Sequence, residues 1–377
     1  MPSSSTQRTP ITERLSAEPE ALVNKSISGI VAMALAILAL PSLASSEIIA
    51  PFPQRTPSDA AMPLDCTTPP EAIVSLAITS KYGSDGPQRD TIDAEANRTF
   101  KKQMKPIRAF SQQLVKRANR YTLRGGIADA QCTLSWLDAW AQGKALSQMD
   151  NPNAEFERAQ TLAGLSIALL QVAPAVRNDA RFATVVRWMT DLATSTNAFF
   201  DATRDRLKGA RNNHAYWAAL ASSSVAALAD DKALRDWSVQ TYHRGVCGAT
   251  AQGTLPLELE RGKKALEYHL FALNALVPVA AFAEANDIPA YDMCDGALRK
   301  IVNFTLKSIR DPAAIALATN KAQEPFVKGM PPAQNLAFLE IYHRAFPGAA
   351  PMERELLQLR PLISTPMGGN QTLLYRH

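Results

Sequence analysis

An all-α fold is predicted for most of this chain by three features of its sequence. From Asp93 onward, alanine and leucine recur at the three- and four-residue spacing that places side chains on one face of a helix. Alternation with a period of two, which is typical of a half-buried strand, is scarce in the same region. Of the 377 residues, 46% are hydrophobic, which is enough for a substantial core in one large domain or two ordinary ones.

The spacing predicts a series of helices, at roughly 93–122, 127–147, 153–175, 178–200, 212–229, 231–248, 260–286, 289–309, 331–345 and 350–362. The breaks between them have the composition of turns and helix caps, at Gly125-Gly126, Asn151-Pro152, Gly209, Asp230-Asp231 and Pro289. Because these linkers are short, neighbouring helices are expected to form antiparallel hairpins. A ring of hairpins, a plain helical bundle and an α-solenoid would all accommodate such helices.

The N-terminal stretch 1–44 has the composition of a secretory signal peptide. The apolar run ISGIVAMALAILAL at 27–40 follows Lys25 and precedes small residues, so cleavage is expected near Ala44. The run is too short to cross a membrane comfortably. We therefore expect a periplasmic or secreted protein without stable membrane association after cleavage. The long stretch before the run would also be explained by an uncleaved anchor or by a gene start placed too far upstream.

Two regions are expected after the signal peptide. Residues 45–92 contain many prolines and are predicted to be an irregular lead-in that includes a glycine-rich, lid-like loop, SKYGSDGP at 80–87. Residues 93–377 are predicted to form the helical domain, in a protein expected to be a monomer.

Charge and cysteine content exclude several function classes. Removing residues 1–44 takes away three basic and three acidic residues, so the exported chain keeps a net charge of +5, which suits a polyanionic partner. Nucleic acid is not expected as that partner, because export separates the protein from it and no basic-aromatic binding signature occurs. The four cysteines form no C-x-x-C, and neither H-E-x-x-H nor D-x-D-x-D-G is present, so we predict no metal site and no cofactor.

Four separated motifs indicate an active site. NNHAYW at 212–217 places an amide pair, an imidazole and two aromatic rings in about one and a half helical turns. ELER at 258–261 leads into a segment in which Tyr268 follows Arg261 by seven residues, a spacing that predicts both side chains on one helical face. SKY at 80–82 and CTLSWLDAWA at 132–141 are the other two motifs.

Taken together, and in this order along the chain, these motifs resemble the bacterial alginate lyase family that cleaves poly(β-D-mannuronate), polysaccharide lyase family 5. The resemblance runs from about Cys66 to about Ile288 and is only loose over the last ninety or so residues. It implies an incomplete α/α toroid, a barrel of antiparallel helical hairpins around an open cleft. It also implies a disulfide between Cys66 and Cys132, which leaves Cys247 to pair with Cys294 by elimination.

The resemblance further implies which residues form the site. The positions that match the catalytic group are Asn213, His214, Arg261 and Tyr268. Lys81 matches a lysine that lines the substrate cleft, and the lid position implies that Tyr82 and Arg89 grip the substrate.

Each of these residue types suits β-elimination of a uronate, in which the sugar carboxylate must be neutralised, C5 must lose a proton and O4 must receive one. Arg261 offers a planar fork of donors and Asn213 an uncharged amide donor. Tyr268 can exchange protons if the Arg261 cation lowers the pKa of its phenol, and His214 can act as base or donor. Taken alone, however, the asparagine-histidine run also fits an ordinary helix cap, and the arginine-tyrosine pair also fits a solvated face.

Tryptophans and two departures from the family pattern bear on the substrate. Trp217 is assigned to the cleft as a platform for a sugar ring, whereas Trp136 and Trp140 fit a hairpin core at least as well. Leu257 replaces an asparagine usual in the family and Gly262 replaces a common arginine, so subsite preference can differ. A lyase for another polyuronate, such as glucuronan or hyaluronan, and a non-catalytic polyuronate-binding protein are the alternatives to a mannuronate lyase.

Overall fold

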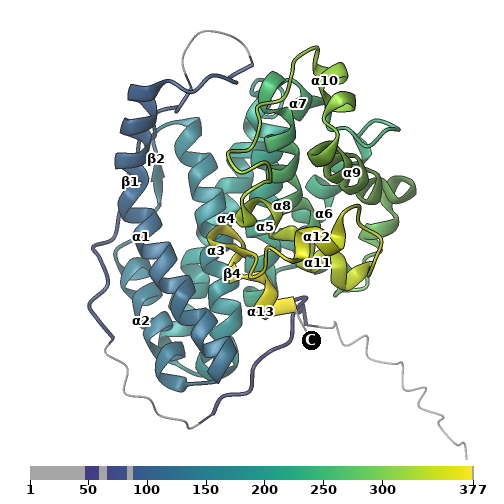
Figure 1. Ribbon diagram of the computed structural model, residues 1–377. Coiled ribbons are helices and arrows are strands. Elements are labelled where there is room, and N and C mark those ends of the chain that lie inside the picture. The colour runs from purple at the N-terminus through teal and green to yellow at the C-terminus, as the bar shows by residue number, and fades with distance from the viewer. Residues whose placement is uncertain (1–46, 59–65, 83–87, 376–377) are drawn as a thin grey trace, which may run out of the picture. The chain divides into compact units, whose positions relative to one another are not determined.

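Helices dominate the structure, a computed structural model that describes residues 47–58, 66–82 and 88–375 (Figure 1). The helices are α1 Ala94–Arg124, α2 Ile127–Gln142, α3 Pro152–Val176, α4 Ala180–Thr203, α5 Asn213–Ala229, α6 Lys232–Cys247, α7 Pro256–Leu259, α8 Ala265–Glu284, α9 Met293–Arg310, α10 Ala313–Thr319, α11 Phe338–Ala345, α12 Glu353–Leu357 and α13 Gln371–Tyr375. The predicted signal peptide and residues 83–87 of the predicted lid lie outside the described residues. The prediction of an all-α fold is confirmed.

Strands are confined, among the described residues, to two short pairs. β1 Ser75–Leu76 pairs in parallel with β2 Gln148–Met149, and β3 Ile363–Ser364 pairs antiparallel with β4 Gly369–Asn370. The β1–β2 pair attaches the lead-in to the helices just before the residues that enter the site.

Capping residues set most helix boundaries where the sequence predicted them. Asp93 begins α1 by accepting a hydrogen bond from the backbone N–H of Ala96, and Asn151 begins α3 in the same way. Gly125 ends α1 with a left-handed φ of 77°, a conformation that glycine adopts without steric cost. Asp230 ends α5 in the left-handed region as well. Chain reversals at these points produce the predicted antiparallel hairpins.

Three helices, α3, α5 and α8, form the buried interior of the helical ring. Each of these helices has buried apolar residues on all of its faces, so neighbouring helices must cover every face. α5 packs against both α3 and α8, while α2, α4, α6 and α9 cover them from outside. This layer of inner helices covered by outer helices is that of the predicted α/α toroid, and the prediction is confirmed.

Two of the inner segments are long and apolar enough to cross a membrane by composition alone. These are helix 152–176 and the stretch 262–284, but 83% and 89% of their apolar windows are buried in this fold.

The predicted helix 260–286 is interrupted. Its first part is replaced by α7 and a 3-10 turn at Gly262–Lys264, and α8 starts only at Ala265. The chain leaves the helical conformation at Gly262, which has a left-handed φ of 55°, and glycine is required there because a Cβ would lie 2.8 Å from a carboxylate oxygen of Asp90. Arg261 and Tyr268 therefore do not share one helical face, and that prediction is wrong. The sequence pattern also failed to predict α10 and α13.

The lead-in is fastened to α2 by three separate contacts. Cys66 and Cys132 form the disulfide that the family resemblance implied, and Cys247 and Cys294 form the second one. Trp136 donates its indole N–H to the carbonyl of Thr67 at 2.7 Å. Trp140 donates in the same way to Pro70 at 3.0 Å, and its ring stacks on Phe110 in the hairpin core. Both tryptophans are thus structural.

Removing the first disulfide should loosen the lead-in. The double substitution Cys66→Ser with Cys132→Ser is expected to lower the free energy of unfolding by about 2–5 kcal/mol, since the cross-link no longer restricts the unfolded chain. Urea denaturation without reductant measures the loss. The matched control, Cys247→Ser with Cys294→Ser, should lower stability without loosening the lead-in, because neither cysteine lies in the lead-in or in α2. Equal rates of proteolytic cleavage within the lead-in of both variants would contradict this role of the Cys66–Cys132 disulfide.

Candidate active site

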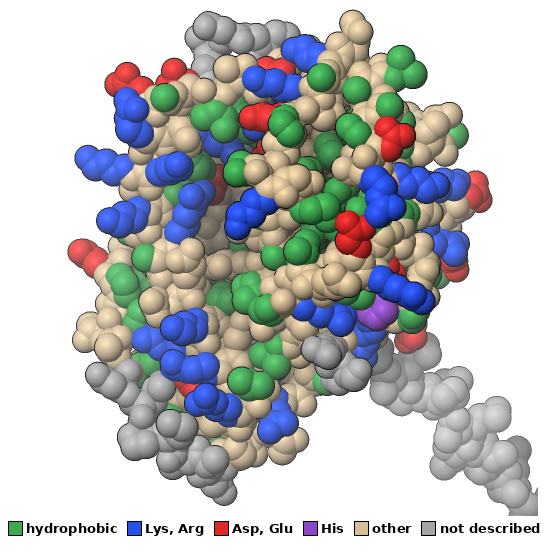
Figure 2. All heavy atoms as spheres, viewed as in Figure 1, with side chains coloured by type: hydrophobic (Ala, Val, Ile, Leu, Met, Phe, Trp, Pro, Cys, Tyr) green, Lys and Arg blue, Asp and Glu red, His purple; other side chains and the backbone are tan. Residues whose placement is uncertain are grey.

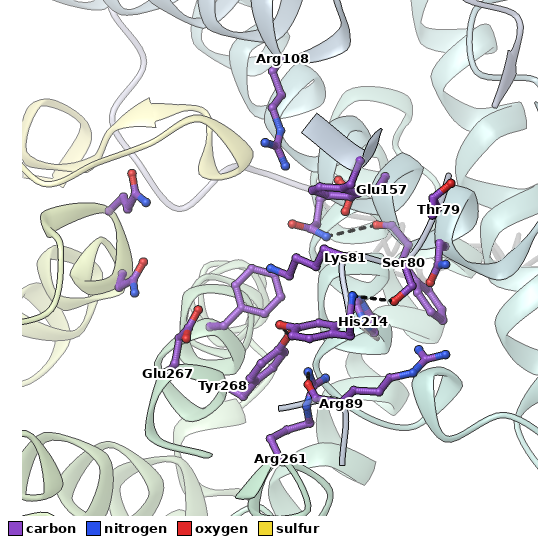
Figure 3. Close-up of a pocket in the computed structure, with 18 residues that line it drawn as sticks. Thr79, Ser80, Lys81, Arg89, Arg108, Glu157, His214, Arg261, Glu267 and Tyr268 are labelled. Atoms are coloured by element: carbon purple, nitrogen blue, oxygen red, sulfur yellow. Dashed lines mark hydrogen bonds between the residues drawn. The ribbon is translucent and has the colours of Figure 1, made fainter. Parts of the chain in front are cut away.

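A cavity of about 330 Å³ opens where the N-terminal ends of α3, α5 and α8 meet the lead-in (Figure 3). Phe156 and Glu157 come from the second turn of α3, His214 from the first turn of α5, and Tyr268 from the first turn of α8. The N-terminus of a helix carries a partial positive charge and attracts anions. Three such ends, together with Lys81, Arg89, Arg108 and Arg261 around the cavity, make it a site for a negatively charged ligand.

Arg261, Tyr268 and Tyr82 form the centre of the cavity wall. The guanidinium carbon of Arg261 lies 3.7 Å from the ring centroid of Tyr268 and 4.8 Å from that of Tyr82. The two tyrosine hydroxyls hydrogen-bond to each other, and either can donate. The turn at Gly262 brings Arg261 over the ring although the two residues are not on one helix. Sequence reasoning therefore paired the right residues for the wrong geometric reason.

The phenol of Tyr268 is protonated in the free protein. Burial raises its pKa well above 10, and Tyr82 raises it further, while the Arg261 cation acts in the opposite direction. The expectation that Arg261 would bring the pKa down is thus correct in sign, but burial outweighs it.

The imidazole of His214 is uncharged at neutral pH. Burial, and then the cations Arg261, Lys81 and Arg89, lower its pKa to about 3. Its ring stacks on Phe156 with centroids 4.0 Å apart, and its Nδ1 has no hydrogen-bond partner among the described residues. A neutral imidazole held in this way can accept a proton or donate one to a ligand.

The lead-in contributes the remaining predicted residues. Lys81 lines the cavity with its ammonium 5.3 Å from the ring centroid of Tyr82. Arg89 has φ 49°, and its carbonyl accepts a hydrogen bond from the Arg261 guanidinium. The structure therefore brings Lys81, Tyr82 and Arg89 together with His214, Arg261 and Tyr268.

Asn213 does not line the cavity. It is fully buried, and its backbone N–H and side-chain amide donate to the two oxygens of Glu258, at 2.8 and 2.9 Å. Burial raises the pKa of Glu258 to about 7, although the hydrogen bonds from Asn213 and the Arg261 cation lower it. The side-chain nitrogen of Asn213 is thus used to fix the start of α5, and a role for Asn213 in neutralising a substrate carboxylate stays a prediction.

Trp217 does not line the cavity either. It is 1% exposed and packs behind Phe271, with ring centroids 5.2 Å apart. It cannot stack on a sugar ring, so its assignment to the cleft is wrong. The helix that starts at Asn213 turns this position toward the core. Leu257 also lies elsewhere, in a separate cavity with Tyr216 and Trp237, and does not shape the site.

Glu157 and Arg108 belong to the cavity and were missed. Burial raises the pKa of Glu157, although Arg108 and Lys81 lower it. A carboxyl group within a cationic cavity is suited to accept hydrogen bonds from sugar hydroxyls. Neither residue stands in a motif, and each looks like an ordinary polar position of a helix, so the sequence offered no signal for them.

Candidate metal ligands cluster at one place among the residues that the structure describes. His243, Cys247 and Cys294 have ligand atoms within 4.8 Å of one another. The two cysteines are joined in a disulfide, so neither offers a thiolate. None of the three residues lines the cavity.

Replacing Glu258 tests its positioning role. Glu258→Ala should lower kcat and destabilise the fold by about 1–3 kcal/mol at pH 5, because two buried donors of Asn213 lose their acceptor. In the wild type the folded Glu258 keeps its proton up to about pH 7, whereas an unfolded glutamate releases it near 4.5. The folded state thus binds more protons in this interval, so the free energy of unfolding falls as pH rises from 4.5 to 7. In Glu258→Ala, which has no carboxyl group at this position, this contribution to the pH dependence should be missing.

Urea denaturation at pH 5 and pH 8 measures both effects. Glu260→Ala is the matched control, since Glu260 is exposed and pairs with Lys208 at the surface. If the Glu258 variant has the stability and kcat of this control, Glu258 does not position the site.

Comparison with known proteins agrees with this geometry. Residues 58–315 match the alginate lyase family. The chain is 29% identical to an alginate lyase of Pseudomonas aeruginosa over 81% of this chain and 84% of that protein. Its fold is similar to that of alginate lyase A1-III from a Sphingomonas species, with a TM-score of 0.72, 21% identity, and coverage of 85% of this chain and 89% of that one. A variant of A1-III complexed with a tetrasaccharide gives a TM-score of 0.73, with 22% identity over 83% of this chain and 87% of that one.

Proposed function

The chain belongs to the alginate lyase family, and from this premise we propose that it depolymerises alginate by β-elimination, that it prefers mannuronate-rich chains, and that it needs no metal ion. The observation that carries the proposal is the Arg261 guanidinium stacked over Tyr268, whose hydroxyl bonds to Tyr82 in a cationic cavity. Arg261, His214 and Tyr268 are the proposed catalytic residues. Lys81, Tyr82 and Arg89 are proposed to bind substrate, and Asn213 to position His214.

Neutralisation of the sugar carboxylate is the first requirement. A uronate carboxylate opposes removal of the C5 proton, because the negative charge that develops at C5 spreads onto it. Arg261 is placed to offset that charge, and its buried Nε has no partner among the described residues. Stabilisation of charge as it develops commonly lowers the activation barrier more than any other single effect.

Proton transfer is assigned to Tyr268. The minor phenolate form of Tyr268, which the Arg261 cation stabilises, takes the proton from C5. The electron pair of the C5–H bond forms the C4=C5 double bond while the C4–O4 bond breaks. O4 then receives the same proton from Tyr268, so the phenolate is restored and the product carries a 4,5-unsaturated end.

The proposed preference for mannuronate follows from the use of one phenol. In mannuronate the C5 hydrogen and O4 leave from the same side of the ring, so one oxygen can reach both. In guluronate they leave from opposite faces. Neutral His214 would then have to take the proton while Tyr268 gives one.

A panel of polymers tests the substrate. Polymannuronate should be cut faster than polyguluronate, and the unsaturated product should be followed by its ultraviolet absorbance. Equal rates on both polymers would assign the base role to His214. Faster cleavage of glucuronan or hyaluronan would support a different polyuronate lyase, and binding without cleavage of any polymer would support the non-catalytic alternative.

Metal independence is tested by chelation. EDTA should leave the rate on polymannuronate unchanged, since the proposed steps use Arg261 rather than a cation to offset charge. Added calcium serves as the control. Loss of activity in EDTA with recovery in calcium would contradict this part of the proposal.

A further inference from the structure

α1 carries a stripe of cations outside the cavity. Arg98, Lys101, Lys102, Lys105 and Arg108 are all exposed, and no acidic residue lies between them in the sequence. Positions 98, 101, 105 and 108 are separated by three or four residues, so they follow one face of the helix with about one cation per 5.4 Å turn. We call these five residues the α1 stripe. Figure 2 shows Lys and Arg side chains gathered over the region where Figure 1 places the first half of α1.

Within the described part of the chain, no member of the stripe forms an ion pair. Elsewhere on the surface, exposed arginines such as Arg177 and Arg310 are paired with carboxylates. An ordinary solvated helix face usually mixes both signs of charge. Five like charges in eleven residues instead repel one another, which destabilises the helix unless a polyanion offsets them.

The stripe is continuous with the candidate active site. Arg108 lines the cavity together with His214 and Tyr268. The same Arg108, with Lys101, Lys102 and Lys105, also lines a hollow of about 570 Å³ on the outer surface of α1. One residue therefore joins the reacting centre to the outer stripe, and a chain that leaves the cavity past Arg108 meets the lysines next.

We propose that the α1 stripe is an exosite that holds the polyuronate chain outside the cavity and guides it past Arg108 to Tyr268. This inference rests on the proposed function, since it needs a long substrate with one negative charge per sugar. Such a polymer matches the regular spacing of cations, and attraction along a charged surface speeds encounter. An anionic membrane would also be attracted to these cations, but a membrane surface would not explain why the stripe continues through Arg108 into the cavity.

The test compares long and short substrates. In the track variant, Lys101, Lys102 and Lys105 are each replaced by Gln, which keeps helix propensity and leaves Arg108 intact. For high-molecular-weight polymannuronate at low salt, kcat/KM should fall about tenfold. For a mannuronate trisaccharide, kcat/KM should not change, because the substrate does not extend beyond the cavity. High salt should remove most of the difference on polymer.

A matched control separates the local effect from net charge. Lys232, Lys300 and Lys307 are exposed, lie on α6 and α9, and form no ion pair among the described residues. Their triple replacement by Gln removes the same charge and should leave kcat/KM on polymer near the wild-type value. Similar losses in both triple variants would overturn the exosite and indicate only a long-range field.

Two other outcomes would also overturn the inference. A loss on the trisaccharide equal to that on polymer would mean that the lysines act within the cavity or on the fold. If the track variant cuts polymer normally but no longer sediments with vesicles containing anionic phospholipid, the stripe serves a membrane surface. Failure of the proposed function can be told apart from failure of the exosite. If the proposed function is wrong, the wild type cuts neither polymannuronate nor the trisaccharide. If only the exosite is wrong, the wild type cuts both, and the track variant has the same ratio of kcat/KM on polymer to kcat/KM on trisaccharide as the wild type.

Discussion

Tyr268→Phe is expected to lower kcat on polymannuronate by about 10²–10⁴-fold, the usual contribution of a positioned acid or base. The substitution removes one oxygen and its exchangeable proton while keeping the ring under the Arg261 guanidinium. Binding should therefore remain, and calorimetry with a mannuronate oligosaccharide should give a Kd within about threefold of the wild type. In the wild type, kcat should rise as pH increases above neutrality, because burial raises the pKa of this phenol.

A second tyrosine provides the control. Tyr82→Phe removes the hydroxyl that bonds to Tyr268 but keeps the ring near Arg261, so it should reduce kcat much less than Tyr268→Phe. Retention of more than a few per cent of the rate by Tyr268→Phe would exclude this residue as the acid and base; that threshold follows from the ~10²-fold lower limit. A larger loss in Tyr82→Phe would transfer the proton-exchanging role to Tyr82.

Arg261→Ala is expected to lower kcat by about 10²–10³-fold, comparable to the removal of one donor aimed at a developing charge. The expected effect falls on kcat rather than KM, because the carboxylate gains negative charge only as C5 loses its proton. Arg261→Lys should retain part of the rate, since it keeps the charge but loses the planar fork. Steady-state kinetics on polymannuronate distinguishes these variants.

Arg89→Ala is the matched control for Arg261. Its side chain is exposed, and the group that Arg261 uses is the backbone carbonyl, which the substitution preserves. Its effect should appear in KM for polymer. If Arg261→Ala raises KM and leaves kcat unchanged, Arg261 is a binding residue and its proposed catalytic role is wrong.

The helices were predictable from sequence because their apolar spacing and caps are local signals. The spacing of α1 to α6 and the capping residues Asp93 and Asn151 depend only on neighbours along the chain. The break before α8 was not predictable in this way. It occurs at Gly262, whose left-handed φ of 55° is not indicated by the apolar spacing of the neighbouring residues.

The candidate site was predicted only in part, because sequence motifs are local signals whereas the site is formed by contacts between distant segments. Residues that match a family motif, such as His214 and Tyr268, do line one cavity. Asn213 and Trp217 were misplaced, because the direction of a side chain depends on how its helix is rotated against its neighbours. Glu157 went unnoticed, since only the approach of Lys81 and Arg108 from other elements distinguishes it from an ordinary glutamate.

The segment that carries Tyr82 is closed at its base. The backbone N–H of Asp93 donates to the carbonyl of Lys81 at 3.1 Å, and Tyr82 forms an antiparallel bridge with Ile92. Insertions or deletions within 83–87 therefore begin and end at fixed points, and they need not displace the Tyr82 hydroxyl. A library of chain lengths at this position should therefore leave the Tyr82 hydroxyl bonded to that of Tyr268.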